Sequence, residues 1–260
     1  MNVYWLEQVE ANVANERNWL SAHENACLND FRFPKRRADW LLGRWTAKQA
    51  LASYLSLPAD SRWLATFELR PAASGAPEAF VENQPANLTV SLSHRAGKAL
   101  CAIAPSGVKL GCDLELVEPR SDAFVADYFT VGEQQLLAQT SGSDRLRLIT
   151  LVWSAKESAL KALREGLRVA TRTVVVSPSM ELSPRAWTKL QVRYQDTRIF
   201  DGWWRYAENM VRTIISDPSP TSPLGLALSA AALEGTANPG EIRLAPRGGA
   251  ASARLPGYSP

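Results

Sequence analysis

Apolar residues occupy every second position over residues 108–116, inside the segment 108–117. The even positions are apolar, and the odd positions carry a lysine, a glycine and the carboxylates of Asp113 and Glu115. A period of two predicts a β-strand with one buried face and one presented face. Asp113 and Glu115 would then project from the same face about 7 Å apart, and two carboxylates so placed repel each other unless a positive charge lies between them.

The remaining pattern mixes helical and extended segments, which predicts an α+β protein. Besides 108–117, the predicted strands are 3–6, 63–69, 88–93, 99–104, 173–177, 190–194 and 211–216. The predicted helices are 9–29, 36–55, one that starts at residue 132, and 146–164. The strands 88–93 and 99–104 would form a hairpin around Gly97, and the Gly- and Pro-containing segment 72–85 is predicted to be a loop.

The last 45 residues differ from the rest in composition. The segment 216–260 holds seven of the sixteen prolines and six of the fifteen glycines, and Tyr258 is its one aromatic residue. Such a segment buries too little apolar surface to offset its loss of conformational entropy. We therefore expect a mostly disordered tail, with a short ordered piece around 224–233.

The predicted helix 146–164 carries Glu157 and Lys161 on one stripe, opposite an apolar stripe of small residues. The pair has two interpretations. It is either a solvated i, i+4 ion pair, which contributes about 0.2–0.5 kcal/mol, or a metal ligand next to a cation for an anionic substrate. The Asp-x-Glu strand favours the second interpretation, because hard Mg²⁺ binds carboxylates and keeps sites for phosphate oxygens.

Basic residues also gather on the predicted helix 36–55, where Arg37, Arg44 and Lys48 share one narrow stripe. The stripe is either a solvated basic face or an edge that binds phosphate, because guanidinium groups pair well with phosphate oxygens. His94 follows a predicted strand and is either structural or functional. Neither pattern decides between these alternatives.

Composition narrows the function classes. A net charge of +3 on 260 residues does not predict the wide basic surface that nucleic-acid binding requires. The three cysteines lie in apolar surroundings without the spacing of metal ligands, which indicates reduced thiols and a cytoplasmic location. We find neither a signal peptide nor an apolar run of membrane-spanning length, and therefore expect no membrane partner.

Five segments resemble the motifs of one enzyme family, the 4′-phosphopantetheinyl transferases. Residues 111–115 fit the family's Gly-x-Asp-x-Glu, and 153–161 fit Trp-(Ser/Thr)-x-Lys-Glu-(Ser/Ala)-x-x-Lys about forty residues later. Residues 128–133 resemble its Phe-Phe-(Ser/Thr)-x-x-Glu, 92–94 its Ser-His element, and 35–48 its N-terminal basic helix. The chain resembles in particular the larger, two-subdomain class that modifies carrier domains of secondary metabolism.

The resemblance implies two similar α/β subdomains with pseudo-two-fold symmetry. Residues 1–107 would bind coenzyme A through the basic helix, 108–215 would hold Mg²⁺, and 216–260 would be a flexible tail. The implied reaction transfers the phosphopantetheine arm of coenzyme A to a serine of an apo acyl or peptidyl carrier protein and releases adenosine 3′,5′-bisphosphate. A monomer is expected.

The resemblance also implies roles for individual residues. The implied Mg²⁺ ligands are Asp113, Glu115 and Glu157. The implied contacts of coenzyme A are Arg36 and Arg44 at its phosphoadenosine end, together with Ser93, His94, Asp113, Lys156 and Lys161. Lys161 would stabilise charge on the phosphoryl oxygens, and the proton acceptor would be either Glu133 or Glu157 acting through a bound water.

Two positions depart from the family pattern. Ser74 stands where many members have a basic residue, and Arg95 follows His94 where a small hydroxyl residue is common. The alternatives are a non-catalytic relative that binds coenzyme A or a carrier protein, and another Mg²⁺-dependent phosphoryl-transfer enzyme.

Overall fold

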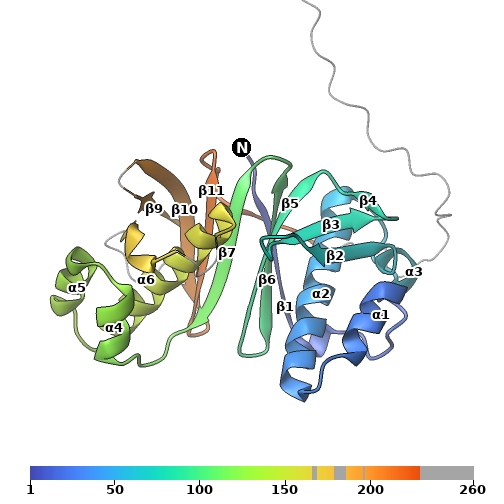
Figure 1. The fold of residues 1–260 in the computed structure, drawn as a ribbon, viewed down its shortest axis with the longest axis horizontal. Helices are drawn as coiled ribbons and strands as arrows, with labels where there is room; N and C mark the ends of the chain where they lie inside the picture. The colour runs from blue at the N-terminus through green and yellow to red at the C-terminus, as the bar shows by residue number, and fades with distance from the viewer. Residues whose placement is uncertain (166–168, 179–185, 196, 229–260) are drawn as a thin grey trace, which may run out of the picture.

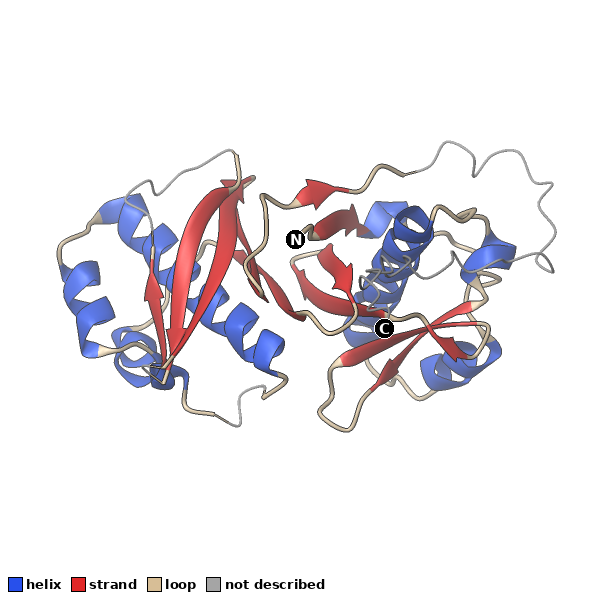
Figure 2. Ribbon diagram, turned by 90° about the horizontal axis from the view of Figure 1, so that it is seen from above, coloured by secondary structure: helices blue, strands red, loops and turns tan. Residues whose placement is uncertain are grey.

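The computed structural model describes residues 1–165, 169–178, 186–195 and 197–228, which form two α+β halves side by side (Figures 1 and 2). The elements of the first half are β1 (Tyr4–Val9), η1 (Glu10–Asn12), α1 (Ala22–Asn29), α2 (Pro34–Leu55), α3 (Ser61–Leu64), β2 (Phe67–Pro71), β3 (Pro77–Val81), β4 (Gln84–Pro85), β5 (Leu88–Arg95) and β6 (Lys98–Pro105). Those of the second half are β7 (Lys109–Leu116), α4 (Asp122–Tyr128), α5 (Val131–Ala138), α6 (Gly142–Leu163), η3 (Thr171–Thr173), β8 (Val174–Ser177), β9 (Thr188–Tyr194), β10 (Arg198–Ala207) and β11 (Met210–Asp217). The chain then returns to the first half through β12 (Leu224–Gly225).

Each half consists of a sheet covered by one long helix. The first sheet has the order β12-β1-β6-β5, with β2-β3-β4 as a small separate sheet, and the second has the order β7-β11-β10-β9-β8. Helix α2 packs on β6, β1 and β5, whereas α6 packs on β7 and β11. The two main sheets lie between the two helices, which flank the molecule on opposite sides (Figure 1). The expected α+β class is confirmed, and the approximate two-fold axis stays a prediction.

The predicted carboxylate strand is present as β7, but both of its faces are covered. Its even positions, Leu110, Cys112 and Leu114, pack against β6 and β11 in the apolar cluster between the sheets. Its odd positions face α6, and Asp113 is only 4% exposed. The prediction of one solvent-presented face was therefore wrong, because α6 covers that face.

Gly111 allows this close packing of β7 on α6. A Cβ atom at Gly111 would lie 1.8 Å from the carbonyl oxygen of Ser158 and 2.7 Å from the amide nitrogen of Ala162. No side chain fits in such a space. The glycine of the Gly-x-Asp-x-Glu segment therefore brings the following carboxylates against the helix that carries Glu157 and Lys161.

Several predicted elements differ from the structure. The predicted helix 9–29 is α-helical only from residue 22, where a capping box of Ser21 and Glu24 starts α1, and the short 3-10 helix η1 precedes it. Residues 63 and 64 of the predicted strand 63–69 belong to the helix α3 instead, and the predicted loop 72–85 contains β3 and β4. Strand β10 was not predicted. No helix of the described residues combines the length and the apolar composition that a membrane crossing requires.

The C-terminal segment is ordered further than predicted. Strand β12 pairs in parallel with β1, and the hydroxyl of Ser53 on α2 donates to the carbonyl of Ala227 at 2.8 Å. Residues 217–228 thus return to the first half. The rest of the predicted tail, residues 229–260, lies outside the described residues.

Candidate active site

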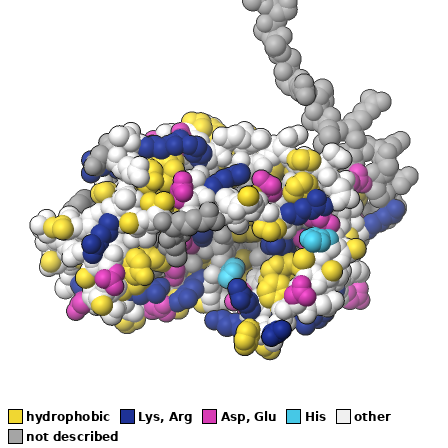
Figure 3. Space-filling model, in the orientation of Figure 1, with side chains coloured by type: hydrophobic (Ala, Val, Ile, Leu, Met, Phe, Trp, Pro, Cys, Tyr) yellow, Lys and Arg dark blue, Asp and Glu magenta, His cyan; other side chains and the backbone are white. Residues whose placement is uncertain are grey.

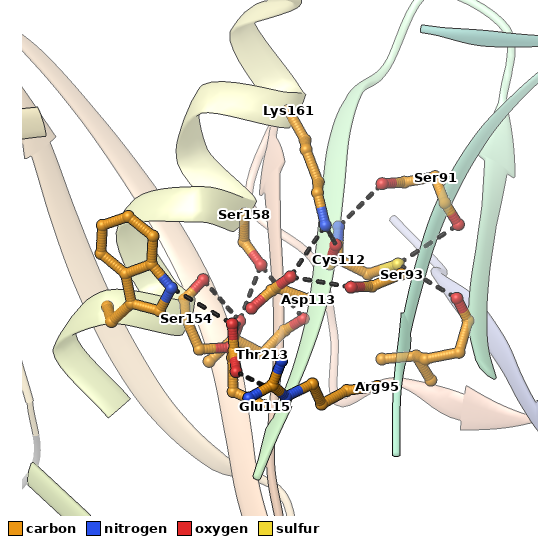
Figure 4. A network of polar contacts seen from close by, with 12 residues as sticks. Ser91, Ser93, Arg95, Cys112, Asp113, Glu115, Ser154, Ser158, Lys161 and Thr213 are labelled. Carbon is orange, nitrogen blue, oxygen red and sulfur yellow. Dashed lines mark hydrogen bonds and ion pairs between the residues drawn. The ribbon is translucent and has the colours of Figure 1, made fainter. Parts of the chain in front are cut away.

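The Asp113 carboxylate lies where the two halves meet (Figure 4). Its Oδ1 accepts hydrogen bonds from Ser93 Oγ on β5 and from Lys161 Nζ on α6, both at 2.8 Å. The same Lys161 ammonium donates to the carbonyl of Cys112 at 3.0 Å. Burial, the largest single cause, would lower the pKa of Lys161, but the hydrogen-bonded Asp113 carboxylate together with Cys112 and Glu157 outweighs it, and the pKa is raised. Lys161 therefore carries its positive charge where α6 packs on β7. It is not one half of a solvated i, i+4 ion pair with Glu157.

The second oxygen of Asp113 has no partner. Within the described residues, its Oδ2 is buried and makes no hydrogen bond. A buried, unpaired carboxylate oxygen is costly, on the order of 1–3 kcal/mol. This atom is where the structure calls for a further donor or a cation.

Glu157, on α6, interacts with the charges of Asp113 and Lys161. Burial and the Asp113 carboxylate raise its pKa, Lys161 opposes the shift, and Glu115 adds to it. Glu157 makes no hydrogen bond or ion pair in the part of the chain that the structure describes. Three carboxylates thus act on one another, and Lys161 compensates only part of their charge.

Glu115 is held by its neighbours. Its Oε1 accepts from the indole nitrogen of Trp153 at 3.2 Å, and its Oε2 accepts from Arg120 at 3.2 Å. Arg95 Nε lies 3.6 Å from the same Oε2. Burial and Asp113 raise the pKa of Glu115, although Arg120, Arg95 and Trp153 act in the opposite direction.

Strand β5 supplies partners from the first half at alternate positions. The hydroxyl of Ser91 accepts from the Cys112 amide at 2.9 Å, Ser93 donates to Asp113, and Arg95 approaches Glu115. Because alternate residues of a strand share a face, these three side chains follow β7 along its length. The site is therefore assembled from both halves.

His94 points to the other side of β5. It lines a cavity of about 330 Å³ together with Lys35, Asp39, Arg95 and Leu116. Figure 3 shows lysine and arginine side chains close to the two histidines on this face of the molecule. Lys35 and Arg95 bring positive charge to this cavity beside Asp39, although Arg95 also pairs with Glu118.

The predicted basic stripe of α2 is divided. Arg36 and Arg44 line a separate cavity of about 470 Å³ between α1 and α2, where the Arg44 guanidinium stacks 4.8 Å from the centre of the Trp40 ring. Burial lowers the pKa of Arg44, and the Nε of this side chain has no hydrogen-bond partner among the described residues. Lys48, in contrast, is fully buried.

The structure does not bring Lys156 and Glu133 to Asp113. Both side chains are buried in the second half, with Lys156 Nζ 2.9 Å from Glu133 Oε2. Lys156 also donates to the carbonyls of Thr171 and Val174, and Glu133 accepts from the Val176 amide at 2.9 Å. These contacts give the pair a structural role and leave no group free for coenzyme A or for a proton from serine.

The donor set at Asp113 fits a divalent cation in part. The unpaired Asp113 Oδ2 and the unpaired Glu157 carboxylate are oxygen ligands of the kind that Mg²⁺ prefers. However, no three His, Cys, Asp or Glu side chains of the described residues group closely enough to form a complete metal site. An incoming ligand would have to supply the remaining oxygens.

Three residues of this site were not assigned a role from the sequence. Trp153 and Arg120 hold Glu115, and Arg95 was noted only as a departure from a motif. Strand alternation could have found Arg95, because it lies two residues after Ser93 as Glu115 lies two residues after Asp113.

Comparison with known proteins adds two findings. Residues 109–215 match the model of the 4′-phosphopantetheinyl transferase superfamily. Over 198 residues the chain is 28% identical to a curated protein named 4′-phosphopantetheinyl transferase HetI, from Nostoc sp. strain PCC 7120. The alignment covers 72% of this chain and 79% of that relative. The matched model includes β7 and α6, and therefore the residues around Asp113.

Proposed function

We propose that this chain is a 4′-phosphopantetheinyl transferase and that it moves the phosphopantetheine arm of coenzyme A onto a serine of an apo carrier protein, which the match of residues 109–215 to the superfamily model and the 28% identity to HetI support. The observation that carries the proposal is Asp113. One oxygen of this carboxylate is fixed by Ser93 and Lys161, and the other is buried without a partner. A site so arranged is prepared for a cation and for the phosphate groups that the cation would bind.

The chain's own residues would position the reacting diphosphate. Lys161 would place positive charge beside the phosphoryl oxygens while the bond to adenosine 3′,5′-bisphosphate breaks. Asp113 and Glu157 would hold Mg²⁺, with Glu115 beside them, and the metal would supply charge stabilisation to the diphosphate. The serine oxygen forms the new bond to phosphorus, and its proton leaves to a base.

Glu157 is the better candidate for that base. It makes no hydrogen bond within the described residues and lies beside Asp113 and Lys161, so that it could accept a proton through a bound water. Glu133 is engaged by Lys156 and by the Val176 amide. We therefore retain Glu157 in this role and assign Glu133 to the framework of the second half.

Two basic cavities are the candidate contacts for the rest of coenzyme A. His94 and Lys35 would meet the diphosphate side, and Arg36 and Arg44 would meet the phosphoadenosine end beside Trp40. Arginine pairs readily with phosphate and stacks on aromatic rings, which suits a phosphorylated nucleoside. The acyl or peptidyl class of carrier, a role in secondary metabolism, a monomeric state and a cytoplasmic location stay predictions.

Mass spectrometry of apo carrier domains tests the reaction directly. Incubation of the full chain with coenzyme A, Mg²⁺ and acyl or peptidyl carrier domains should add one phosphopantetheine group to the carrier. The Asp113→Asn variant and a sample with EDTA serve as controls and should add none. Carriers of both classes that stay unmodified, while the chain still binds coenzyme A by calorimetry, would indicate a non-catalytic relative. Cleavage of coenzyme A without a carrier would indicate a different phosphoryl-transfer enzyme.

A further inference from the structure

We propose that Arg95 is a positioning residue that keeps Glu115 away from the metal, so that a divalent cation in this protein is held by Asp113 and Glu157 alone. The inference rests on the proposed function for the presence of a cation. It concerns which of the three carboxylates bind it.

Both oxygens of Glu115 are already in use (Figure 4). The Trp153 indole donates to Oε1 at 3.2 Å, the Arg120 guanidinium donates to Oε2 at 3.2 Å, and Arg95 Nε lies 3.6 Å from Oε2. Because each carboxylate oxygen has two lone pairs, a cation that approached Glu115 would compete with these donors rather than meet an unpaired group. The carboxylate is satisfied by the chain itself.

Glu118 closes a ring around these contacts. Arg95 donates to Glu118 Oε1, and Arg120 Nη2 lies 3.3 Å from the same oxygen. Each arginine thus bridges Glu115 and Glu118. Four alternating charges in a ring support one another, and the side chains of Arg120 and Glu115 are largely buried. The ring fixes Glu115 more firmly than either arginine would alone.

Asp113 and Glu157, in contrast to Glu115, have carboxylate oxygens without a hydrogen-bond partner among the described residues. Asp113 Oδ2 is buried and unpaired, and the Glu157 carboxylate has no hydrogen bond or ion pair among the described residues. These are the oxygens from which a cation displaces no donor of the chain. Mg²⁺ is usually bound through one or two carboxylates together with substrate phosphates and waters, so two ligands suffice.

The register of β5 brings a different side chain to each of the two neighbouring carboxylates of β7. Ser93 and Arg95 are two residues apart on β5, as Asp113 and Glu115 are on β7. Ser93 is neutral and small, and occupies one Asp113 oxygen only. Arg95 brings a positive charge to Glu115. Strand β5 thereby leaves one oxygen of Asp113 available for a cation and holds Glu115 by a positive charge.

Binding of Mn²⁺ alone to the full chain, measured by electron paramagnetic resonance, tests this assignment without coenzyme A or a carrier. Asp113→Asn and Glu157→Gln should each weaken Mn²⁺ binding on the order of tenfold or more. Glu115→Gln should weaken it clearly less than either of these variants, because the side chain is outside the coordination shell. The double variant Arg95→Ser/Arg120→Ser releases Glu115 as an additional ligand and should tighten binding by about threefold or more.

A loss of Mn²⁺ affinity in Glu115→Gln as large as that in Asp113→Asn overturns the proposal. A double arginine variant that binds Mn²⁺ no tighter than the natural chain overturns it as well, since Glu115 would then not be withheld. The reaction is tested separately: the expected Mn²⁺ pattern without transfer to carriers defeats the proposed function alone, whereas transfer with a metal-binding Glu115 defeats this inference alone.

Discussion

Both halves bury a lysine at the fifteenth residue of a 22-residue helix, Lys48 in α2 and Lys156 in α6. Each lysine forms an ion pair with a glutamate, Glu24 or Glu133, that belongs to the capping box of a shorter helix. Each donates to two backbone carbonyls, and burial lowers the pKa of each. The two halves therefore share one framework.

The glutamates complete the correspondence. Glu24 Oε1 accepts from the Leu69 amide on β2 at 3.4 Å, and Glu133 Oε1 accepts from the Val176 amide on β8 at 2.9 Å. In both halves, one carboxylate thus joins a helix start, the long helix and a strand. We call each of these arrangements a buried Lys–Glu pair.

The halves differ at the positions that carry the candidate site. In the long helices, Glu157 and Lys161 correspond to Gln49 and Ser53, since each pair occupies the sixteenth and twentieth residues. In the strands, Asp113 pairs with the fourth residue of β11, and Leu6 pairs with the fourth residue of β6. By the same register, Gln8 corresponds to Glu115. With the residue of the second half named first, the corresponding positions are Asp113 and Leu6, Glu115 and Gln8, Glu157 and Gln49, and Lys161 and Ser53.

This difference separates what folds the chain from what the chain does. The buried Lys–Glu pairs occur in both halves and therefore belong to the fold. The four charged side chains occur in the second half only, where β5 of the first half covers them with Ser93 and Arg95. The first half has kept the framework and contributes partners rather than carboxylates.

The largest effect is expected from removal of one member of a buried pair. Lys48→Met or Lys156→Met leaves a buried glutamate without its counter-charge, which should cost about 3–5 kcal/mol of unfolding free energy. Chemical denaturation followed by tryptophan fluorescence measures this cost. If the pairs are equivalent, the two variants lose similar amounts.

The double variant Lys48→Met/Glu24→Gln is the control for that comparison. It removes both charges, so that part of the lost stability should return, while the neutral side chain keeps the capping position. A loss below about 1 kcal/mol in either single variant would show that this half does not depend on its pair, and the two frameworks would no longer be equivalent.

Conversion of a second-half position to its first-half residue should remove activity instead of stability. Glu157→Gln copies Gln49 and is expected to reduce the transfer rate about 10²–10³-fold, the range for loss of one preorganised electrostatic group. Folding should be preserved, because Glu157 has no hydrogen bond to lose within the described residues. The matched variant Gln49→Ala should keep the rate within about threefold. Equal losses of transfer rate in both variants would contradict the conclusion that only the second half carries the catalytic side chains.

The sequence predicts the parts of this molecule that depend on local periodicity. The alternation in β7, the Gly97 hairpin and the two long helices are visible because their apolar positions recur with the period of the element. Strand β10 was missed because the segment that contains Asp201, Gly202 and two tryptophans shows no clear alternation in hydrophobicity, although its burial alternates.

Long-range partners were not visible in the sequence. The sequence around Lys156 and Glu133 looks the same whether these residues bind phosphate, act as a base or form a buried ion pair. Only the fold distinguishes these roles. A local signal did exist, because Ser21-x-x-Glu24 and Thr130-x-x-Glu133 both fit a capping box. The two similar halves were expected from the family resemblance alone, because they share mainly a few buried positions and no sequence repeat stands out.

A moderate effect is expected where β7 packs on α6. Gly111→Ala places a methyl group 1.8 Å from the Ser158 carbonyl oxygen, so the strand must move away from the helix. We expect a loss of about 1–3 kcal/mol in unfolding free energy and a fall in transfer rate, because Asp113 moves with Gly111. Gly43→Ala on α2, where a Cβ meets no atom within 4 Å, should instead stabilise by up to about 1 kcal/mol. Equal stabilities of the two variants would show that the close contact is not needed.

The smallest effect concerns Cys112, which lies at the joint between the halves. Its thiol donates to the Ser91 carbonyl at 3.2 Å, and burial raises its pKa to about 11. At pH 8, about one molecule in a thousand would carry the reactive thiolate, even before access is considered.

A thiol reagent should therefore modify the half-exposed Cys27 first and Cys112 only when the halves separate. Coenzyme A, whose diphosphate would lie at the joint, should slow the modification of Cys112 in the native protein, whereas unfolding in denaturant should make the reaction fast. If Cys112 reacts as fast as Cys27 in the native protein, then β5 does not cover β7 in solution, and the two halves act more independently than their shared site requires.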